Sequence, residues 1–454
     1  MLPLWHLLLA LAPANLTVVS GDEGGLSRAL AQAEAGAVIT VEGGVWRGSF
    51  MINTPLTLIG KNGATLDGGG EGTVLSILAP DVTVRGLTIT GSGRRLDAEN
   101  SGVSVEAPRA TIEDNILNEV LFGLYLKSSP QSVVRNNRIT GFPIAVPRRG
   151  DPIRIWESDG TQVVGNVVES GRDVVLWFSS DLVVMNNSIS NGRYGLHFMY
   201  CDGAKVIENA FINNSVGAFL MFSRDLRMEN NLFLGNYGPS GYGVGLKDVD
   251  DALVADNLFL GNRVGVHMDN SPRQVDSIGH VHHNVFSRNT LGISLMPSVR
   301  NNAFWANAFL ENDEQVLIAG RGGYAASNSW SHNGVGNYWS DYRGFDGDGD
   351  GLGDYPYRSD RLFESIMARY PTLRLFVNTP AARALDYAAR AFPLVAPRPI
   401  LEDNYPLIEM PPIPPAPKPP MPNGGPLTAA AGGILLLAVT LGFLGKESFL
   451  GGSP

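Results

Sequence analysis

The feature that most constrains the fold is a repeat with a period near 22 residues, which runs from about residue 80 to residue 320. Each unit has a glycine followed by alternating apolar residues, a polar turn, and a short apolar stretch set between asparagines, as in "YGLHFMYCDGAKVIENAFINN". The apolar stretches are too short for helices and alternate in the manner of strands. Such a period predicts an all-β solenoid, a right-handed parallel β-helix over residues 15–320.

The interior of this β-helix follows from the same alternation. One asparagine recurs in each unit, and its side-chain amide can bond the equivalent amide of the next rung, which gives a structural ladder that includes Asn187, Asn209, Asn231 and Asn257. The rival solenoid, a leucine-rich repeat, is disfavoured because its helical half and its L-x-x-L-x-L core are missing. The residues predicted to stack inside include Leu196, Phe198, Ala218, Leu220, Val266, Met268, Ile293 and Leu295.

The outward positions of the same strands hold side chains that are unusual for a solvated surface. Neighbouring rungs lie about 4.8 Å apart, so Met199 and Met221 are expected to be direct neighbours, with His197 beside them. Two interpretations stay open: a covering segment makes this face ordinary core, or its thioethers and imidazoles form a surface for Cu(I), which soft ligands select. The candidate copper ligands are His197, Met199, Met221, His267 and Met296.

Other possible ligands for a soft or borderline metal lie outside this column. Cys201 is the only cysteine, so no disulfide can form within the chain, and its thiol is expected beyond the end of the strand that carries Met199. His280, His282 and His283 form either a second group of ligands or a polar turn.

The segment "GFDGDGDGLGDYPY" predicts a calcium loop. Alternating carboxylates can converge on one hard cation, and Gly351 permits a sharp turn between them. The loop is not an EF-hand, because its twelfth position is Tyr357 rather than a glutamate. The alternative is a flexible acidic surface loop. The candidate ligands are Asp346, Asp348, Asp350 and Asp354.

The aromatic residues around this loop predict a cap. A β-helix needs its last rung covered, and large rings would cover it. Residues 321–410 are therefore expected to form a C-terminal cap that calcium reinforces. The rings expected to take part are Tyr338, Trp339, Tyr342 and Tyr355.

Both ends of the chain suggest export and a membrane anchor. Residues 1–14 have an apolar run and a small-residue site typical of an export signal. Residues 411–426 form a proline-rich linker, expected to be a stiff and extended spacer. Residues 427–445 then hold an apolar stretch long enough to span a bilayer, or to dock on a partner as a helix. These features predict an exported domain tethered to the inner membrane.

The stretches "NYWSDYRGFDGDGDGLGDYPYR" and "EDNYPL", downstream of the asparagine rungs, resemble the NosD family over about residues 15–410. The resemblance implies a periplasmic protein, not an enzyme, required to assemble the copper clusters of nitrous oxide reductase. It also implies partners: an ABC-type ATPase and membrane permease, and an exported chaperone that supplies copper, bound transiently as Cu(I). The family offers no catalytic residues to transfer, and the C-terminal membrane segment departs from its pattern.

Two other classes of function are compatible with a β-helix. A carbohydrate-active lyase, hydrolase or epimerase needs acids and bases on one strand face, and an adhesin needs no such site. Nucleic-acid binding is not expected, because 34 Lys and Arg face 44 Asp and Glu, a formal charge of −10. Lys247 and Asp269 could equally form a cross-rung ion pair. The nearest enzyme-like group is Lys247, Asp248, Asp250, Asp251, His267 and Asp269.

Overall fold

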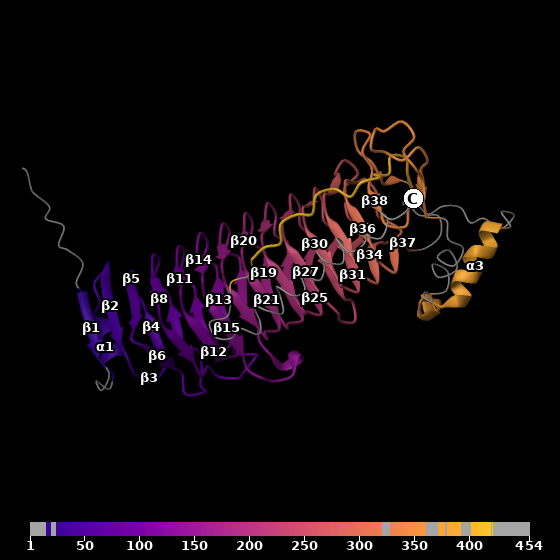
Figure 1. Ribbon diagram of the computed structural model, residues 1–454. Coiled ribbons are helices and arrows are strands. Elements are labelled where there is room, and N and C mark those ends of the chain that lie inside the picture. The colour runs from indigo at the N-terminus through magenta and orange to yellow at the C-terminus, as the bar shows by residue number, and fades with distance from the viewer. Residues whose placement is uncertain are drawn as a thin grey trace, which may run out of the picture.

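The computed structural model describes residues 15–19, 24–319, 327–359, 371–376, 379–391, 401–418 and 420. Three parallel sheets wind into one long solenoid, in which each strand pairs with its equivalents in the neighbouring rungs (Figure 1). This architecture confirms the predicted parallel β-helix. The expected export signal, residues 1–14, and the expected membrane helix, residues 427–445, lie outside the described residues.

Sheet A is the first wall of the solenoid, and most of its strands are short because a turn follows after three residues. Its strands are β1 (Asn15–Val19), β2 (Ala37–Glu42), β5 (Leu56–Lys61), β8 (Thr83–Arg85), β11 (Thr111–Glu113), β14 (Val133–Arg135), β17 (Gln162–Val164), β20 (Val183–Met185), β23 (Lys205–Ile207), β26 (Arg227–Glu229), β29 (Leu253–Ala255), β32 (Gly279–His282) and β35 (Asn302–Trp305).

Sheet B follows sheet A in each rung. Its strands are β3 (Val45–Arg47), β6 (Thr65–Asp67), β9 (Thr88–Thr90), β12 (Ile116–Val120), β15 (Arg138–Gly141), β18 (Val167–Glu169), β21 (Ser188–Ser190), β24 (Ala210–Ile212), β27 (Leu232–Leu234), β30 (Leu258–Leu260), β33 (Val285–Ser287), β36 (Ala308–Leu310) and β38 (Tyr338–Trp339).

Sheet C carries the longest strands from the middle of the solenoid onward. Its strands are β4 (Phe50–Ile52), β7 (Leu75–Ile77), β10 (Ser101–Val105), β13 (Phe122–Lys127), β16 (Ile153–Trp156), β19 (Asp173–Trp177), β22 (Tyr194–Met199), β25 (Val216–Met221), β28 (Tyr242–Lys247), β31 (Val264–Asp269), β34 (Leu291–Leu295) and β37 (Glu314–Ile318).

The predicted inward residues of sheet C are all buried in the core. Sheet B adds a second inner column that the sequence analysis did not single out, a stack of phenylalanine rings from Phe211 through Phe233, Phe259 and Phe286 to Phe309. Successive ring centroids lie 4.9 to 5.0 Å apart and the planes are nearly parallel. This spacing is that of the strands themselves, so identical rings at equivalent positions stack without adjustment.

The predicted asparagine ladder is confirmed. Asn209 donates from its backbone N–H and from Nδ2 to Oδ1 of Asn231, at 2.9 and 3.0 Å, and Asn231 does the same to Asn257. The pattern continues from Asn115 to Asn337. A second ladder, which the sequence analysis missed, runs through Asn214, Asn236, Asn262, Asn289 and Asn312. Both ladders satisfy buried polar groups at the turns.

Each end of the solenoid is covered. At the N-terminal end, α1 (Gly25–Gln32) buries Leu26 and Leu30 against the first rungs. At the C-terminal end, the ring of Trp339 lies between Phe309, at 4.3 Å, and Tyr357, at 4.2 Å. The remaining elements are the 3-10 helices Val146–Arg148 and Pro371–Phe376, the helix α3 (Pro380–Ala391), and the strand pair β39 (Tyr357–Arg358) and β40 (Glu402–Asp403).

The predicted aromatic cap is correct in kind but not in every ring. Trp339 covers the last rung as expected, and Tyr342 packs on the core at its edge. Tyr355 is 60% exposed and contacts the ring of Phe345 in the acidic loop, whereas Tyr357, two residues later, is buried and stacks on Trp339. Tyr338 faces outward, because side chains alternate along a strand and its neighbour Trp339 faces in.

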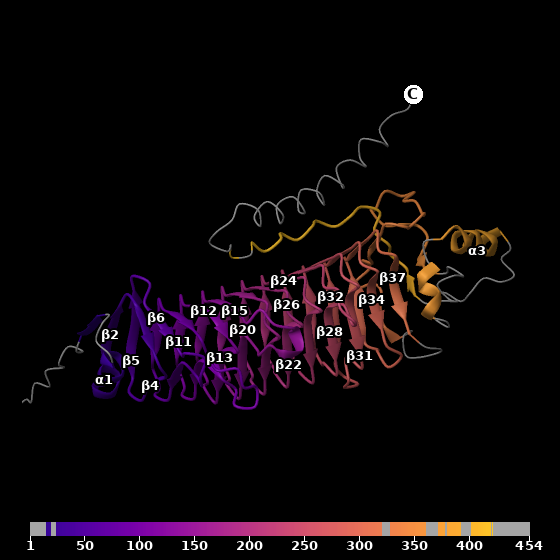
Figure 2. The ribbon, with the colours of Figure 1, turned by 90° about the horizontal axis from the view of Figure 1, so that it is seen from below.

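The proline-rich segment differs from the expected free spacer. Residues 409–418, here called the proline strap, leave the C-terminal cap and run back along the outside of sheet B (Figure 2). Met410 and Ala416 pack against the apolar outer face of sheet B, and Pro414 and Pro417 are buried. The chain is extended as predicted, but it is held on the solenoid rather than standing away from it.

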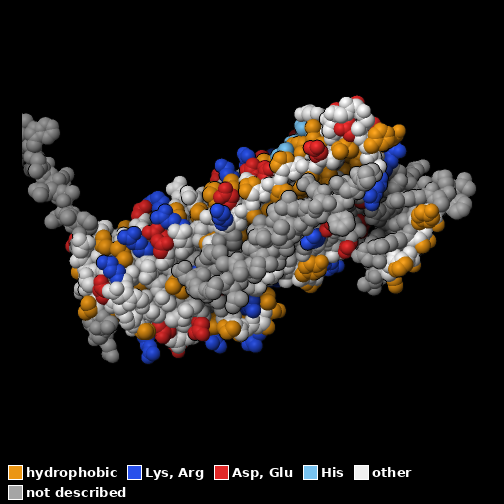
Figure 3. All heavy atoms as spheres, in the orientation of Figure 1, with side chains coloured by type: hydrophobic (Ala, Val, Ile, Leu, Met, Phe, Trp, Pro, Cys, Tyr) orange, Lys and Arg blue, Asp and Glu red, His pale blue; other side chains and the backbone are white. Residues whose placement is uncertain are grey.

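The outer face of sheet B changes character where this strap lies. Its outward residues are Ser188 and Ser190 in β21, but Leu232 and Leu234 in β27. In the space-filling view, a band of hydrophobic side chains follows the path of the strap along the C-terminal half of the molecule (Figure 3). Ten extended residues span about 31 Å, so the strap is long enough to cross five rungs, which cover roughly 24 Å. Within the described ranges, no helix is long and apolar enough to cross a membrane.

Candidate functional site

The outer face of sheet C carries most of the side chains that the sequence singles out. Two columns of side chains run along it, and in each column every strand contributes one residue, which is the register partner of the residue on the next strand. One column reads Arg154, Val175, His197, Phe219, Gly245 and His267. The other reads Trp156, Trp177, Met199, Met221, Lys247 and Asp269.

Met199 and Met221 are direct neighbours in the second column, as the repeat predicts. Both side chains are partly exposed, and Trp177 precedes them while Lys247 follows them. The proline strap packs on sheet B instead, so it does not cover this pair. Two adjacent thioethers that reach solvent beside an indole form a soft and open pair of ligands.

His197 lies beside this pair, in the first column. Its side chain is buried between the rings of Trp177 and Tyr194, at centroid distances of 5.3 and 5.1 Å. Its Nδ1 is buried and has no hydrogen-bond partner within the part of the chain that the structure describes. Burial lowers the pKa of His197, which favours the neutral imidazole, the form that can bind a metal.

His267 does not share a site with His197. Three rungs separate them, or about 14 Å, with Phe219 and Gly245 between. A Cβ at Gly245 would lie 2.5 Å from the Phe219 ring, so this glycine leaves room for the rings that close the gap. His267 stacks on Tyr242 at 4.3 Å, and its Nδ1 lies 3.3 Å from the Ser294 hydroxyl.

Two further candidates lie away from the face. Met296 follows the end of β34 and packs against the main core cluster. Cys201 is fully buried, and its Sγ lies 3.0 Å from the Leu176 carbonyl oxygen. Burial raises the pKa of the Cys201 thiol to about 12, so the thiolate needed for metal binding is strongly disfavoured. The structure therefore brings together His197, Met199 and Met221, but not Met296 or His267.

This face is bordered by a ladder of aromatic rings that was not predicted from the sequence. Phe178, Tyr200 and Phe222 each follow a sheet C strand and stack on one another at 5.3 and 5.2 Å. Phe178 and Tyr200 are 41% and 49% exposed. All three have left-handed backbones, with φ of 52°, 56° and 53°, which are unfavourable for bulky residues. The signal in the sequence is an aromatic residue directly after each of three successive strands.

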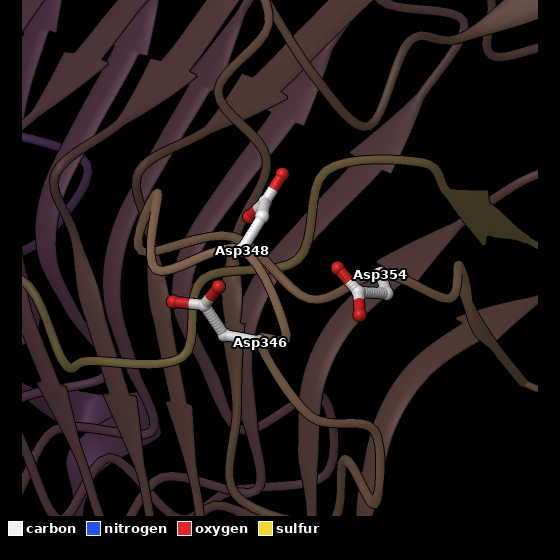
Figure 4. A group of neighbouring side chains, drawn as sticks. All are labelled: Asp346, Asp348 and Asp354. Atoms are coloured by element: carbon white, nitrogen blue, oxygen red, sulfur yellow. The ribbon is translucent and has the colours of Figure 1, made fainter.

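The acidic loop forms a separate group of carboxylates at the C-terminal cap. Oxygens of Asp346, Asp348 and Asp354 lie within 4.8 Å of one another (Figure 4). Asp350 does not join them; its Oδ1 accepts the backbone N–H of Leu352 at 2.8 Å. Asp346 accepts the N–H groups of Gly349 and Gly351, which holds the loop in a tight turn. Three converging carboxylates suit a hard cation such as calcium.

The side chains of the enzyme-like group, on and next to β28 and β31, are engaged in contacts that stabilise the fold. Lys247 and Asp269 form the cross-rung ion pair, at 3.5 Å, that the sequence analysis held as an alternative. Asp250 is buried and accepts the backbone N–H groups of Arg273 and Gln274. Asp248 accepts a hydrogen bond from Asn270. These carboxylates stabilise turns and do not converge on an open cleft.

Known proteins provide an independent comparison. A family model described as "Periplasmic copper-binding protein (NosD)" matches residues 140–344. A relative from Pseudomonas aeruginosa, described as "Probable ABC transporter binding protein NosD", is 32% identical over 416 residues, which cover 87% of this chain and 95% of the relative. A relative from Stutzerimonas stutzeri with the same description is 30% identical over 387 residues, which cover 81% and 86%.

Solved structures resemble the solenoid. The A-module of a mannuronan C-5 epimerase from Azotobacter vinelandii aligns with a TM-score of 0.55 and 14% identity, over 69% of this chain and 96% of that module. The catalytic unit of an α-1,3-glucanase from Streptomyces thermodiastaticus also gives 0.55, with 12% identity, over 70% and 66%. At such low identity the likeness shows a shared β-helix fold and nothing about activity.

The two sequence stretches that carry the family resemblance meet in the structure. Trp339 of "NYWSDY" donates from Nε1 to Oδ2 of Asp403 in "EDNYPL", at 2.9 Å, although the two residues are far apart in the chain. The stretches thus build one structural unit, the C-terminal cap, rather than two separate motifs. Together with the length and identity of the two alignments, this shows that the chain belongs to the NosD family.

Proposed function

We propose that this protein is a periplasmic accessory protein for the assembly of the copper clusters of nitrous oxide reductase. It accepts Cu(I) from an exported chaperone and passes it on, in concert with an ABC-type ATPase and membrane permease. Support comes from the family, whose model is described as copper-binding, and from relatives described as ABC transporter binding proteins. The observation that carries the proposal is the open thioether pair of Met199 and Met221 on sheet C.

The chemistry of this pair suits transfer rather than storage. Thioethers select Cu(I) and need no deprotonation, so they bind it without releasing protons. The indole of Trp177 precedes the pair in the same column, where its face can stabilise a cation. His197 can add a neutral imidazole from the adjacent column. A few exchangeable ligands on a surface release an ion readily, whereas a closed site would hold it.

The aromatic ladder beside the pair provides a surface for the protein that exchanges copper. Exposed aromatic rings are typical of interface cores. Phe178, Tyr200 and Phe222 retain left-handed backbones, each of which costs roughly 1–2 kcal/mol for a bulky residue. Later rungs keep the left-handed conformation at this position but place Asp248 and Asn270 there, so the fold does not require an aromatic side chain. We infer that the ladder guides a partner onto the copper ligands.

We further propose that calcium binds at Asp346, Asp348 and Asp354 and fixes the cap. This role is structural, because the loop is bonded to the cap through the Gly353 N–H and the Pro406 carbonyl oxygen and contains none of the candidate copper ligands. The expected tether to the inner membrane rests on residues 427–445, so it remains a proposal from the sequence.

Complementation of a strain that lacks the gene tests the copper proposal. Replacing Met199 and Met221 together by Leu keeps volume and hydrophobicity nearly constant, so the protein should still fold. Reductase activity should fall sharply in cells that carry this double variant. Met51, exposed on the same sheet at β4, gives the matched control: Met51→Leu should support full activity. Full activity in the double variant would contradict the proposal.

A further inference from the structure

A cluster of histidines occupies the outer face of sheet A at the C-terminal end of the solenoid. The chain has seven histidines, and four of them lie here around the indole of Trp305. Histidine atoms are visible at the corresponding edge of the molecule, next to the C-terminal cap (Figure 3). This histidine cluster consists of His280 and His282 on β32, His283 directly after β32, and His332 from the segment that precedes β38.

Two of these imidazoles already face each other. Nδ1 of His282 lies 2.8 Å from Nδ1 of His283, with the ring planes almost perpendicular, at 88°. His282 also packs on Trp305, its register partner in the next rung, at a centroid distance of 4.3 Å. His283 is exposed and has a left-handed backbone, with φ of 54°, which turns its side chain back toward His282. Two ring nitrogens therefore point into one place at the protein surface.

The other two imidazoles lie around the same indole. His280 contacts Trp305 edge-on at 5.6 Å, and His332 lies 4.8 Å from it. The two rings are 6.5 Å apart, and Nδ1 of His280 is buried with no hydrogen-bond partner among the described residues. His332 is exposed, in a tight turn closed by backbone hydrogen bonds with Val335. Among the described residues, no third His, Cys, Asp or Glu ligand atom lies within 4.8 Å of both nitrogens of the His282–His283 pair, so His280 and His332 flank the pair rather than join it.

The electrostatic surroundings suit a bound cation. Asp256 interacts with His283, Glu229 with His282, and Asp251 with His280. Carboxylates beside metal-binding histidines orient the rings and strengthen them as ligands.

We propose that the histidine cluster binds one divalent transition-metal ion, with Cu²⁺ held more tightly than Zn²⁺. His282 and His283 provide two ligands through their ring nitrogens, and water completes the coordination. Imidazole ligands suit such borderline ions, and the cluster has no thioether or thiolate that would select Cu(I). The site lies on sheet A and does not share a residue with the thioether pair on sheet C. It therefore goes beyond the proposed transfer of Cu(I) and does not depend on it.

Titration of the metal-stripped full-length protein with CuSO₄ and ZnSO₄ tests this site. One equivalent of Cu²⁺ should bind, with an electron paramagnetic resonance spectrum that shows coupling to two nitrogens, and it should quench part of the tryptophan fluorescence. The double variant His282→Gln/His283→Gln should bind Cu²⁺ more than about 100-fold more weakly. Unchanged affinity and an unchanged spectrum in this variant would overturn the proposal.

Three further variants make the test specific. Trp305→Phe should keep the affinity but lose the metal-dependent quenching, because Trp305 is the indole in contact with the ligands. Met199→Leu/Met221→Leu should leave Cu²⁺ binding unchanged, so failure of the Cu(I) proposal is distinguishable from failure of this one. If the double histidine variant does not fold, His283→Gln, at an exposed position, replaces it. A reduction of the coupling from two nitrogens to one supports the site, and a wild-type spectrum counts against it.

Discussion

The inner columns of the solenoid and the outer columns of sheet C are built from the same repeats, yet they differ in kind. Inside, one residue type occupies a position for many rungs, as in the phenylalanine stack from Phe211 to Phe309. Outside, a single column passes from Trp177 through two methionines to Lys247 and Asp269. The fold requires the same residue type at an inner position of successive rungs, because stacked amides hydrogen-bond one another and stacked rings pack on one another. It does not require any particular residue outside, so the outer columns are free to vary from rung to rung.

The largest effect on stability is expected inside, in the asparagine ladder. Asn231→Ala removes the acceptor of two hydrogen bonds from Asn209 and the Nδ2 donor to the Val206 carbonyl. Leaving such groups buried and unpaired should cost about 3 kcal/mol or more. Thermal unfolding should shift down by several degrees. The control is Asn53→Ala at an exposed position, where little change is expected; equal shifts in both variants would contradict the role of the ladder.

A smaller loss is expected at the end of the same ladder. Asp403 accepts N–H groups from Asn337 at 2.7 Å, Trp339 at 2.9 Å and Tyr405 at 3.0 Å. Asp403→Asn keeps the shape but offers one acceptor oxygen instead of two, which should lower the free energy of unfolding by about 2 kcal/mol. Asp403→Ala should lose more. Chemical denaturation of both variants measures this, and an Asn variant as stable as the parent would show that the second oxygen is dispensable.

The proline strap is expected to affect association more than folding. A chain that ends at Ile408 exposes the apolar outer face of sheet B, whereas a chain that ends at Pro420 keeps it covered. The shorter chain should self-associate, because exposed apolar patches of this kind promote contact between copies. Light scattering after size-exclusion chromatography compares the two. Two equally monomeric chains would show that the strap is not needed as a cover.

Calcium at the cap should contribute a few degrees to the melting temperature. Chelation should remove this contribution, and Asp348→Ala should reproduce the loss, because Asp348 is one of the three converging carboxylates. Asp350→Ala is the matched control, since its carboxylate lies outside the group, and it should retain a response to calcium. If chelation leaves the unfolding curve of the parent protein unchanged, the loop is not a structural calcium site.

Features that recur from rung to rung could be predicted from the sequence, whereas features that occur once could not. The inward alternation and the Asn209 to Asn257 ladder recur with a fixed period, so the fold and its core were predictable. The docking of the proline strap could not be predicted, because a polyproline segment has no sequence pattern that specifies the surface it packs on. The one indication is the change from Ser190 to Leu234 on the outer face of sheet B. His280, His282 and His283 stand together in the sequence, whereas His332 approaches His280 and Trp305 only through the winding of the chain, so sequence spacing could not reveal its place.

The central claim is that Met199 and Met221 bind Cu(I) on the outer face of sheet C, at positions where the fold does not require methionine. Cu(I) competition titration tests this claim most directly. The measurement compares purified Met199→Leu/Met221→Leu with the parent protein and with Met51→Leu, under anaerobic conditions. The account predicts a melting temperature within about a degree of the parent for both variants, and loss of Cu(I) binding in the double variant alone. Parental Cu(I) affinity in a folded double variant, or a double variant that fails to fold, would contradict it and return these methionines to the core.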